Sequence, residues 1–397
     1  MRSLPKVLLV GGPDVDARLE LMHRLSTAVE ISAAGSLPGL RDKFTAQGFR
    51  YNPYPLNRRV NPIGDLLTMS QLFLIFRRLK PQIVHTFDTK PGVWGCLAAR
   101  LAGVPVVITT LTGLGSLYSS KSLTTRLLRG IYQSLQKLAC WLADLTIFQN
   151  RDDARQFIAE GVVPAGKAIV IPGSGIATEQ FAPARISPRE QAKFKSEVGI
   201  QPGEIVVTMI SRVIRSKGVL EFMAAARVAR LDHPHARFLL IGPPDDDSVD
   251  RLSPKEQELL KQAVIWPGPR NDIPAVLAAS DIFVLPSAYG EGIPRVLLEA
   301  ASMGLPIVTT DSHGCNDVVQ NGVNGFVVPV RDTAALSQAI GRLIEQPKLR
   351  QSFGNASRQR ALQYFDLSVV ADKTRSAYQQ LLVRKTLLPA VTATESG

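Results

Sequence analysis

The sequence predicts an α/β fold made of two doubly wound domains, each with a parallel sheet between helices. Short apolar runs alternate with amphipathic segments along the chain, and turns rich in glycine and proline separate them. Strands that alternate with helices at this pace imply right-handed crossovers within a parallel sheet. At 397 residues the chain is longer than one hydrophobic core normally supports, so two domains are expected.

Buried strands and amphipathic helices alternate through the first half. Runs rich in Val, Ile, Leu and Ala predict strands over 6–10, 29–34, 49–53, 83–87, 106–110, 145–148 and 168–171. Apolar residues at helical spacing predict helices over 19–28, 40–46, 62–80, 92–102 and 122–141. The helix that starts at Asn61-Pro62 has an apolar stripe that includes Ile63, Leu66, Leu67, Leu72 and Ile75.

A turn cluster over 171–176 marks the domain boundary. It combines glycine, proline and serine, and Pro183 and Pro188 extend this stretch as a linker. We therefore place the domains at 1–176 and 177–367. The strands expected in the second domain are 205–210, 238–242, 264–268, 282–285, 306–310 and one that ends at 328. The helices expected there are 219–229, 271–279, 294–304, 333–345 and 348–364, with a further helix over 368–385.

Residues 281–310 concentrate the polar groups that point to function. A buried strand, Ile282–Leu285, leads into a loop that carries Glu291 between two glycines. Pro294 suits the first position of the next helix, and Glu299 lies about a turn and a half into it. Open α/β sheets bind ligands at the carboxyl ends of their strands, and a helix N-terminus favours an anion. We therefore expect both glutamates to reach one ligand.

This stretch resembles the family 4 glycosyltransferases, retaining enzymes of the GT-B fold whose signature is two glutamates separated by seven residues. The resemblance implies two domains that face a cleft, with the donor mainly in the second and the acceptor in the first. It also implies that the helix 368–385 packs back on the first domain. Glu291 would be catalytic, near the reacting carbon of the sugar, and Glu299 would bind the ribose. The residues between them that would contact the donor are Gly292, Ile293, Pro294 and Arg295.

Arg212 and Lys217 look like the phosphate-binding pair of the same family. Both follow the strand 205–210, at its carboxyl end. A nucleotide diphosphate leaving group needs positive charge as the glycosidic bond breaks. Arginine binds a phosphate bidentately, and lysine adds a point charge. We therefore expect the nucleotide sugar to be the donor substrate, with no metal and no other cofactor; the three scattered cysteines show no metal-ligand spacing.

The first half carries candidate contacts to both substrates. Gly11-Gly12 ends the first strand, and in the family this loop lines the cleft, so Gly12 would bind the donor and Gly11 the acceptor or sugar. The segment 111–118 resembles a subset that acts on lipid-linked sugars, such as the N-acetylgalactosaminyltransferases with diphospho-undecaprenol acceptors. Thr112, followed by Gly113, stands where many members have a histidine that contacts the donor sugar. His85 is either a ligand contact or a packed histidine at a strand end.

Charge separates the two halves of the chain. The net charge is +12, and residues 1–176 hold 21 basic residues against 11 acidic ones. Within 43–143 there are 13 basic residues and two acidic ones, Asp65 and Asp88. Such a segment suggests a polyanionic partner, for which nucleic acid, anionic lipid and a diphosphate-linked acceptor all qualify.

The helix 122–141 has the composition of a helix that lies on an anionic bilayer, with basic residues between leucines and a tryptophan. Its basic residues, with the one just before it, are Lys121, Arg126, Arg129 and Lys137. The alternative is a core helix with a basic outer face. No run of about 18 apolar residues is present, and the N-terminus has the pattern of a first strand, not of a secretory signal. We expect a cytoplasmic enzyme held at the inner face of the cytoplasmic membrane.

The sequence thus predicts a glycosyltransferase of surface polysaccharide or glycan assembly. It would move a sugar, such as an N-acetylhexosamine, from a UDP-sugar to a polyprenyl-diphosphate-linked saccharide with retained anomeric configuration. The alternatives are a nucleotide-sugar epimerase or hydrolase on the same fold, or a basic nucleic-acid-binding protein. No zinc pattern, RNA-binding aromatic signature or recognition-helix motif is visible, so we expect no nucleic acid partner.

Overall fold

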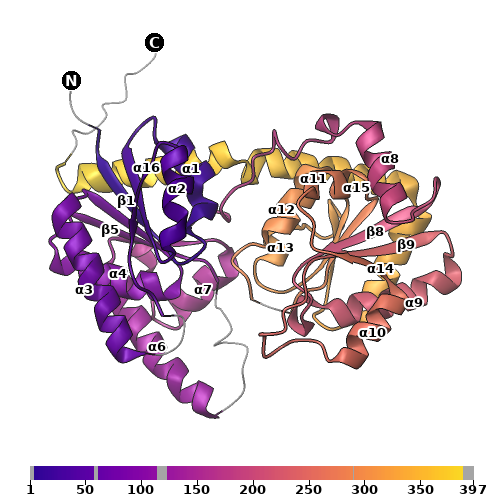
Figure 1. Ribbon diagram of the computed structural model, residues 1–397, viewed down its shortest axis with the longest axis horizontal. Coiled ribbons are helices and arrows are strands. Elements are labelled where there is room, and N and C mark those ends of the chain that lie inside the picture. The colour runs from indigo at the N-terminus through magenta and orange to yellow at the C-terminus, as the bar shows by residue number, and fades with distance from the viewer. Residues whose placement is uncertain (1–3, 58–60, 114–122, 289, 388–397) are drawn as a thin grey trace. The chain divides into compact units, whose positions relative to one another are not determined.

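The computed structural model describes residues 4–57, 61–113, 123–288 and 290–387, except the side chains at 123–129, 131 and 132. The chain forms two compact units, one of residues 1–174 with 367–397 and the other of residues 175–366. In each unit a parallel sheet lies between layers of helices (Figure 1). The division falls within the turn cluster in which the sequence places the linker.

The first unit contains a sheet in the order β3-β2-β1-β4-β5-β6-β7, and every pair of neighbouring strands is parallel. Its strands are β1 (Lys6–Val10), β2 (Glu30–Gly35), β3 (Arg50–Pro53), β4 (Ile83–Phe87), β5 (Val106–Leu111), β6 (Leu145–Phe148) and β7 (Ala168–Val170). Its helices are α1 (Leu19–Leu25), α2 (Arg41–Ala46), α3 (Pro62–Leu79), α4 (Thr89–Leu101), α6 (Leu123–Leu142), α7 (Arg151–Ala159) and α16 (Leu367–Arg384). The sequence analysis did not predict α7.

Both faces of this sheet are buried, which explains why its strands are apolar throughout. Val7 and Leu9 point into a core that also contains residues of α1 and α16. Leu8 and Val10 point to the other face, into a core formed with α3, α4 and α6. Alternate residues of one strand thus contact opposite helix layers, as in other doubly wound sheets.

The C-terminal helix α16 is part of the first unit, where it packs against α1. Its Tyr378 is fully buried, and the hydroxyl lies 2.7 Å from Nδ1 of His85 on β4. The other ring nitrogen of His85, Nε2, lies 2.7 Å from Thr110 Oγ1. Burial, together with the charge of Arg18, lowers the pKa of His85 to about 3, so the ring is neutral. His85 is 2 % exposed, so the structure favours the packed histidine over a ligand contact.

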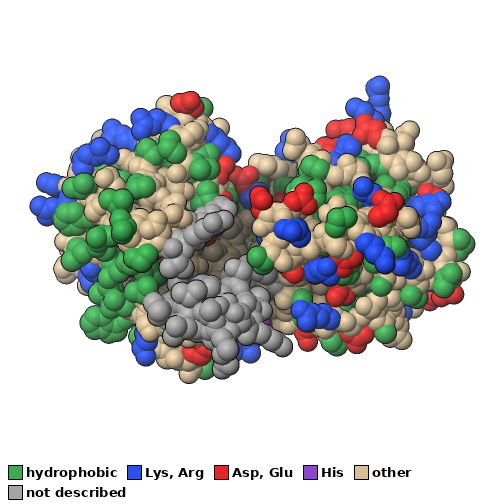
Figure 2. Space-filling view, turned by 60° about the horizontal axis from the view of Figure 1, so that its bottom comes forward, with side chains coloured by type: hydrophobic (Ala, Val, Ile, Leu, Met, Phe, Trp, Pro, Cys, Tyr) green, Lys and Arg blue, Asp and Glu red, His purple; other side chains and the backbone are tan. Residues whose placement is uncertain are grey.

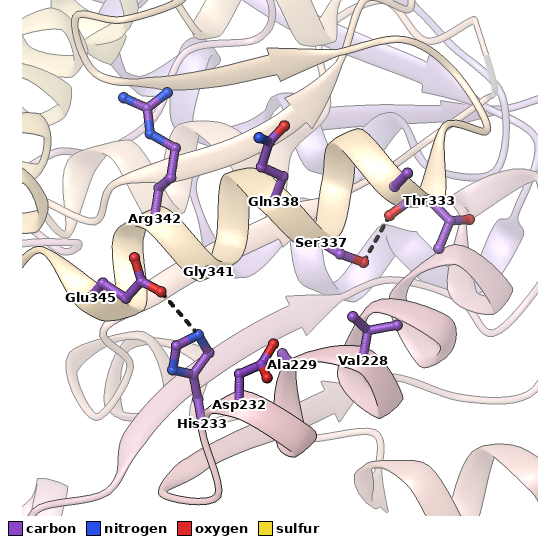
Figure 3. Close-up of a pocket in the computed structure, with 11 residues that line it drawn as sticks. Val228, Ala229, Asp232, His233, Thr333, Ser337, Gln338, Gly341, Arg342 and Glu345 are labelled. Atoms are coloured by element: carbon purple, nitrogen blue, oxygen red, sulfur yellow. Dashed lines mark hydrogen bonds and ion pairs between the residues drawn. The ribbon is translucent and has the colours of Figure 1, made fainter.

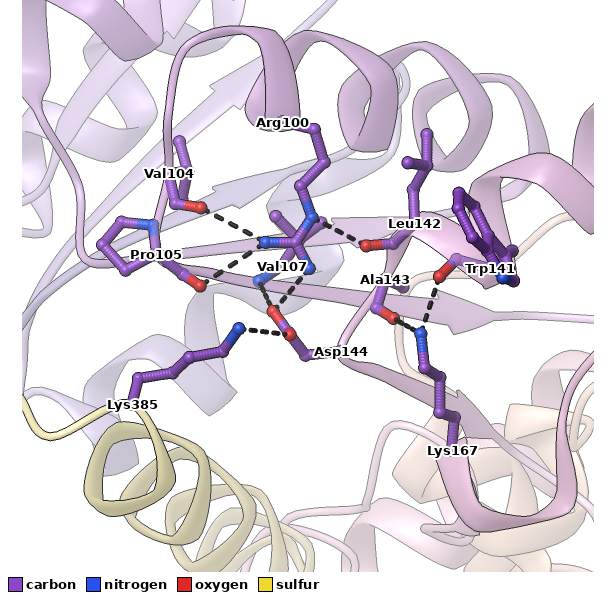
Figure 4. Close-up of polar contacts among 10 residues, drawn as sticks. All are labelled: Arg100, Val104, Pro105, Val107, Trp141, Leu142, Ala143, Asp144, Lys167 and Lys385. Atoms are coloured by element: carbon purple, nitrogen blue, oxygen red, sulfur yellow. Dashed lines mark hydrogen bonds and ion pairs between the residues drawn. The ribbon is translucent and has the colours of Figure 1, made fainter.

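A second polar cluster connects Lys385, the residue after α16, to the amino ends of β5 and β6 (Figure 4). Asp144 accepts hydrogen bonds from Arg100 at 2.7 Å and from the Val107 amide at 2.9 Å, and Lys385 pairs with it at 3.0 Å. Burial by itself would raise the pKa of Asp144, but these three donors outweigh it and hold the pKa below its ordinary value. Lys167 donates to the carbonyls of Trp141 and Ala143 at the end of α6.

The second unit contains a parallel sheet in the order β10-β9-β8-β11-β12-β13. Its strands are β8 (Ile205–Ile210), β9 (Ala236–Ile241), β10 (Ile265–Gly268), β11 (Ile282–Leu285), β12 (Ile307–Thr310) and β13 (Gly325–Val328). Its helices are α8 (Pro188–Glu197), α9 (Val219–Asp232), α10 (Pro254–Ala263), α11 (Ile273–Ala278), α12 (Arg295–Ser302), α13 (Cys315–Val318), α14 (Thr333–Glu345) and α15 (Pro347–Arg360). A π-helical turn, Ala361–Phe365, follows α15.

Two helices of this unit correct the expected linker and loops. The stretch around Pro188 was interpreted as linker, but Pro188 is the first residue of α8. Ser187 caps that helix, and its hydroxyl and amide both bond the Glu190 side chain in a capping box. Ser253 and Glu256 form the same arrangement at α10, which was also not predicted. In both cases proline marks a helix start and not an interruption.

Within the part of the chain that the structure describes, no helix is long and apolar enough to cross a bilayer.

Candidate functional site

The strongest cluster of predicted residues lies at the carboxyl ends of β8 and β11. These two strands are neighbours, and Ile282 of β11 pairs with Val207 of β8. From these two strands the sheet extends outward in opposite directions, toward β10 on one side and β13 on the other. The place between them is the topological switch point, where such sheets bind ligands. The loop after β8 carries Lys217, and the loop after β11 carries Glu291. Lys217 Nζ lies 2.5 Å from Glu291 Oε1, although 74 residues separate them in the chain.

Two glycines hold the loops around this ion pair in close contact. Gly218, at the start of α9, has a φ of +79°, and a Cβ there would lie 2.0 Å from the Pro286 carbonyl oxygen. Gly314 also has a φ of +79°, and a Cβ there would lie 2.2 Å from the Gly292 carbonyl oxygen. Any larger residue at either position would push the loops apart and displace Lys217 or Glu291.

The ion pair is mostly enclosed by protein. The side chains of Lys217 and Glu291 are 12 % and 19 % exposed. Ser287 Oγ lies 3.4 Å from Glu291 Oε1 and tightens the loop. Burial raises the pKa of Cys315 to about 11, and the nearby Glu291 carboxylate adds to the rise. The thiol is therefore protonated at neutral pH, and the charged groups of the cluster are the lysine and the glutamate.

The other charged residues among the predicted donor contacts are Arg212, after β8, and Arg295 and Glu299 on α12, and each has a partner of opposite charge. Arg212 Nη1 lies 2.5 Å from Asp245 Oδ2, and the Arg212 side chain is largely exposed. Arg295 Nε donates to Glu299 Oε1 at 3.1 Å, and Glu299 is buried. The helix α12 begins at Arg295, one residue later than predicted, and Pro294 is its N-cap residue, with no side-chain hydrogen bond to cap the helix. An anion at this end of α12 would lie in a favourable helix dipole.

A groove of about 780 Å³ elsewhere in the second unit contains none of the predicted residues. It lies between α9 and α14, and His233 Nε2 and Glu345 Oε1 lie 3.5 Å apart across it (Figure 3). Its α9 residues belong to the C-terminal half of that helix, whereas Lys217 precedes the N-terminus. We therefore interpret this groove as a crevice between two surface helices and not as the donor site.

In the first unit, polar groups meet at the carboxyl ends of β1, β4 and β5. Gly12 follows β1, Asp88 follows β4 and Thr112 follows β5. The strand order reverses between β1 and β4, so this is the switch point of the first sheet. Thr112 Oγ1 donates to Asp88 Oδ1 at 2.9 Å, and the Gly12 amide also bonds Asp88. A Cβ on Gly12 would stand at ordinary contact distance, 3.7 Å, from Asp88 Oδ2.

Asp88 is a residue of this cluster that sequence reasoning did not select. Its backbone has φ +67° and ψ 171°, a region that is essentially restricted to glycine and costs roughly 1–3 kcal/mol. Burial and the neighbouring Asp14 raise the pKa of Asp88, against the opposing influence of Arg18, Thr112 and Gly12. Strain and a raised pKa together at a switch point indicate a functional carboxylate. Its position directly after a buried strand was the signal in the sequence.

The remaining candidates of the first unit differ in what surrounds them. The Gly11 carbonyl accepts a hydrogen bond from Tyr54, and a Cβ on Gly11 would lie 2.9 Å from Val15. Gly113 has a φ of +131° and ends the described part of its loop. Across the described residues, no group of three or more His, Cys, Asp or Glu side chains is arranged to hold a metal ion.

Solved structures of other proteins have the same fold. The structure of Anabaena HepE in complex with UDP has a TM-score of 0.78 and 20% identity, and covers 94% of this chain and 100% of that one. A glycosyltransferase from Rickettsia africae has a TM-score of 0.79 and 19% identity, with 96% and 99% covered. The fold is therefore that of the GT-B glycosyltransferases.

The sequence comparisons identify the family. Residues 16–173 match the model described as the glycosyl transferase 4-like domain, and residues 190–360 match that of glycosyl transferases group 1. The UDP-Gal:α-D-GlcNAc-diphosphoundecaprenol α-1,3-galactosyltransferase of Escherichia coli is 31% identical over 335 residues, 83% of each chain. The N,N′-diacetylbacillosaminyl-diphospho-undecaprenol α-1,3-N-acetylgalactosaminyltransferase of Campylobacter jejuni is 31% identical over 348 residues, 86% of this chain and 90% of that one. The chain belongs to the family 4-like, group 1 glycosyltransferases.

Membership in this family confirms the predicted class of enzyme, a glycosyltransferase, and the predicted fold. The epimerase, hydrolase and nucleic-acid-binding alternatives gain no support from these comparisons.

The first prediction concerns the two basic residues after β8. Arg212→Ala and Lys217→Ala should each lose at least about tenfold in transfer rate, or about 1.4 kcal/mol of transition-state stabilisation. Arg215→Ala is the matched control, because Arg215 lies in the same turn but is held by Glu256 of α10 and is not one of the predicted donor contacts. Steady-state kinetics at saturating acceptor measures the effect. Normal turnover by both variants would show that the diphosphate is held elsewhere.

The second prediction separates the two glutamates. Glu299→Gln should mainly raise the KM for the donor, because a ribose contact is equally strong in ground and transition states. Glu291→Gln should mainly lower kcat, because it removes the carboxylate that lies against Lys217. Glu345→Gln, in the groove between α9 and α14, serves as the control and should change neither constant. Identical defects in the two site variants would contradict separate roles.

The third prediction concerns Asp88. Asp88→Asn keeps the shape but removes the charge, and should lower kcat/KM for the acceptor at least about tenfold, with donor binding intact. Asp88→Gly should lose the same activity while it melts no lower than the wild type, since glycine relieves about 1–3 kcal/mol of backbone strain. Acceptor kinetics and thermal melts provide the two measurements. If Asp88→Asn is fully active, the strained carboxylate serves the fold and not the reaction.

Proposed function

We propose that this glycosyltransferase moves a hexose or N-acetylhexosamine from a UDP-sugar to a saccharide linked to polyprenyl diphosphate, with retained anomeric configuration. The observation that carries the proposal is the Lys217–Glu291 pair at the switch point of the second sheet. The names of both 31%-identical relatives specify a diphospho-undecaprenol acceptor, and the name of the E. coli enzyme also specifies a UDP-sugar donor. These names support the same substrate classes here, in the assembly of a surface polysaccharide or glycan.

The residues of the second unit suit the departure of a nucleoside diphosphate. In the reaction the bond between the sugar C1 and the diphosphate oxygen breaks, and a bond from an acceptor hydroxyl oxygen to C1 forms. The electron pair of the broken bond stays on the diphosphate, and the proton of the hydroxyl leaves with it or passes to solvent. Lys217 and Arg212 stabilise the charge that develops on the leaving group, so no metal ion is needed. Glu291 lies on the sugar side of Lys217, and Glu299 binds the ribose.

Carboxylates hold the two cations of the candidate donor site. Lys217 pairs with Glu291, and Arg212 pairs with Asp245. A diphosphate that enters the site exchanges these contacts for a bidentate contact from Arg212 and a point-charge contact from Lys217. Donor binding on these loops therefore selects a doubly charged anion over a single carboxylate or chloride.

We also propose that the enzyme is held at the inner face of the cytoplasmic membrane without a spanning helix, where its lipid-linked acceptor resides. The excess of 13 basic over two acidic residues within 43–143 supports attraction to anionic lipid. In the described part of α6, Lys137, Leu138 and Trp141 are exposed, as a helix on a bilayer requires. The predicted membrane contacts of Lys121, Arg126 and Arg129 involve side chains that lie outside the described residues.

The transfer reaction itself tests the function. Among nucleotides, UDP should raise the melting temperature most, because binding to the native state alone stabilises it. Incubation with UDP-galactose, UDP-N-acetylgalactosamine or UDP-N-acetylglucosamine and a diphospholipid-linked N-acetylhexosamine should give a disaccharide, with unchanged yield in a chelator. Mass spectrometry detects the product, and NMR of its anomeric proton reports an α-linkage from an α-linked donor. Release of free sugar without a lipid-linked product would favour a hydrolase, and an epimerised nucleotide sugar would favour an epimerase.

A further inference from the structure

The side of α3 that faces away from the core is apolar. It includes part of the apolar stripe that the sequence shows. Leu72 and Ile75 of that stripe are buried, as expected. The other stripe residues, and Leu74, face away from the core: Ile63 is 78 % exposed, Leu66 60 %, Leu67 54 % and Leu74 57 %. We call these four residues the α3 face. Their spacing places them along one side of the helix. Single exposed leucines are ordinary, but four on one helix face mark an interaction surface.

The helix layer that contains α3 continues this apolar character. α3 packs on α4, and α4 packs on α6. Leu101 at the end of α4, and Leu138 and Trp141 near the end of α6, are also exposed. Figure 2 shows hydrophobic side chains gathered on the left side of the first unit, with basic side chains above them.

The charges around the α3 face are of one sign among the described residues of 43–143. Neither of the two acids of this segment is an exposed residue, although Asp88 is only partly buried. Asp65 is buried and pairs with Lys90 at 2.7 Å, and Asp88 accepts the hydrogen bond from Thr112. The basic residues at the end of α3 are, in contrast, exposed: Arg77, Arg78 and Lys80. The surface therefore combines apolar residues and cations with no exposed carboxylate from the same segment.

We infer that the α3 face docks on an anionic lipid bilayer. The four apolar side chains enter the boundary between headgroups and acyl chains, and Arg77 and Lys80 lie against the lipid phosphates. The choice of a membrane as partner rests on the proposed function, in which the acceptor is a polyprenyl lipid. It differs from the attachment through the helix 122–141, because it assigns the inserted residues to α3.

A second copy of the chain is a poorer occupant of this face. In a twofold dimer with parallel α3 helices, Arg77 would meet Arg77. In an antiparallel arrangement, the basic end of one α3 would meet residues 61–64 of the other, which include no acidic side chain. Neither arrangement offers these cations an opposite charge. A bilayer that contains anionic lipid has the opposite charge and matches both features of the surface.

A fluorophore at position 67 tests the insertion directly. Cys96, Cys140 and Cys315 are all buried, so Leu67→Cys gives a single reactive thiol for an environment-sensitive dye. Vesicles of mixed phosphatidylcholine and phosphatidylglycerol should shift the emission to the blue, and pure phosphatidylcholine should do so much less. Leu231→Cys on α9, 83 % exposed, is the control and should not respond. A dye at position 67 that stays in water while the protein sediments with the vesicles would overturn the proposal.

Removal of the apolar side chains of the α3 face provides a second test of the proposal. The triple variant Leu66→Ser, Leu67→Ser and Leu74→Ser should bind mixed vesicles at least about tenfold more weakly. The control triple variant Val228→Ser, Leu231→Ser and Val249→Ser removes exposed apolar residues of the second unit and should bind as the wild type does. Equal binding by both triple variants would overturn the proposal. A wild-type dimer that the α3 variant converts to a monomer, with vesicle binding unchanged, would assign the face to a second copy instead.

Vesicle binding is measured without donor or acceptor, so it is read independently of the reaction. If the wild type shows no transfer activity but the dye at position 67 still inserts, the proposed substrates are wrong. The inferred membrane surface is then unaffected. Full transfer to a lipid-linked acceptor with no insertion would count against the surface alone.

Discussion

One geometric constraint determines where this protein can hold a substrate: every strand of each sheet runs in the same direction. All loops that follow a strand therefore gather at one edge of the sheet, and the reversal of strand order separates two of them enough for a ligand. In the second unit those loops carry Lys217 and Glu291, 74 residues apart in sequence and 2.5 Å apart in space. In the first unit the corresponding loops carry Gly12 and Asp88. The same topological rule thus produces both groups of candidate site residues.

Strands and most helices could be predicted because each leaves a local pattern in the sequence. Strands with both faces buried are continuous apolar runs, and β1, β4, β6, β8 and β11 have the predicted bounds. Two of the missed helices, α8 and α10, are polar helices that lack a strong apolar stripe. Both α8 and α10 begin with serine, then proline, and then a glutamate at the third helical position. That capping signal was present in both, but Pro188 was interpreted as part of the linker and no helix was predicted at Pro254. Capping energetics, not hydrophobic periodicity, defines these two helices.

The candidate site residues that could be predicted are those whose chemistry is visible from their own loop. Lys217 and Glu291 follow buried strands and carry the charges that a nucleotide sugar needs. His85 shows the limit of this reasoning, since it also ends a strand, but Tyr378 from the far end of the chain occupies one ring nitrogen. Asp88 shows the converse, because its importance rests on a backbone dihedral angle and a raised pKa. Its position after a buried strand is visible in the sequence, but the dihedral angle and the raised pKa are not, since both depend on which strands become neighbours.

The two units also differ in whether carboxylates pair with their exposed cations. This difference predicts two kinds of anion binding. In the second unit the cations at the site have carboxylate partners within 2.5 Å. An anion must displace those partners, so weak or singly charged anions gain little, and a chelating diphosphate is favoured. In the segment 43–143 the acids are directed inward, and the cations at the end of α3 face solvent. Attraction there needs no displacement, acts over about a Debye length of 8–10 Å, and weakens with salt. Selective binding of a soluble donor and broad attraction to a charged surface can therefore coexist in one chain with a net charge of +12.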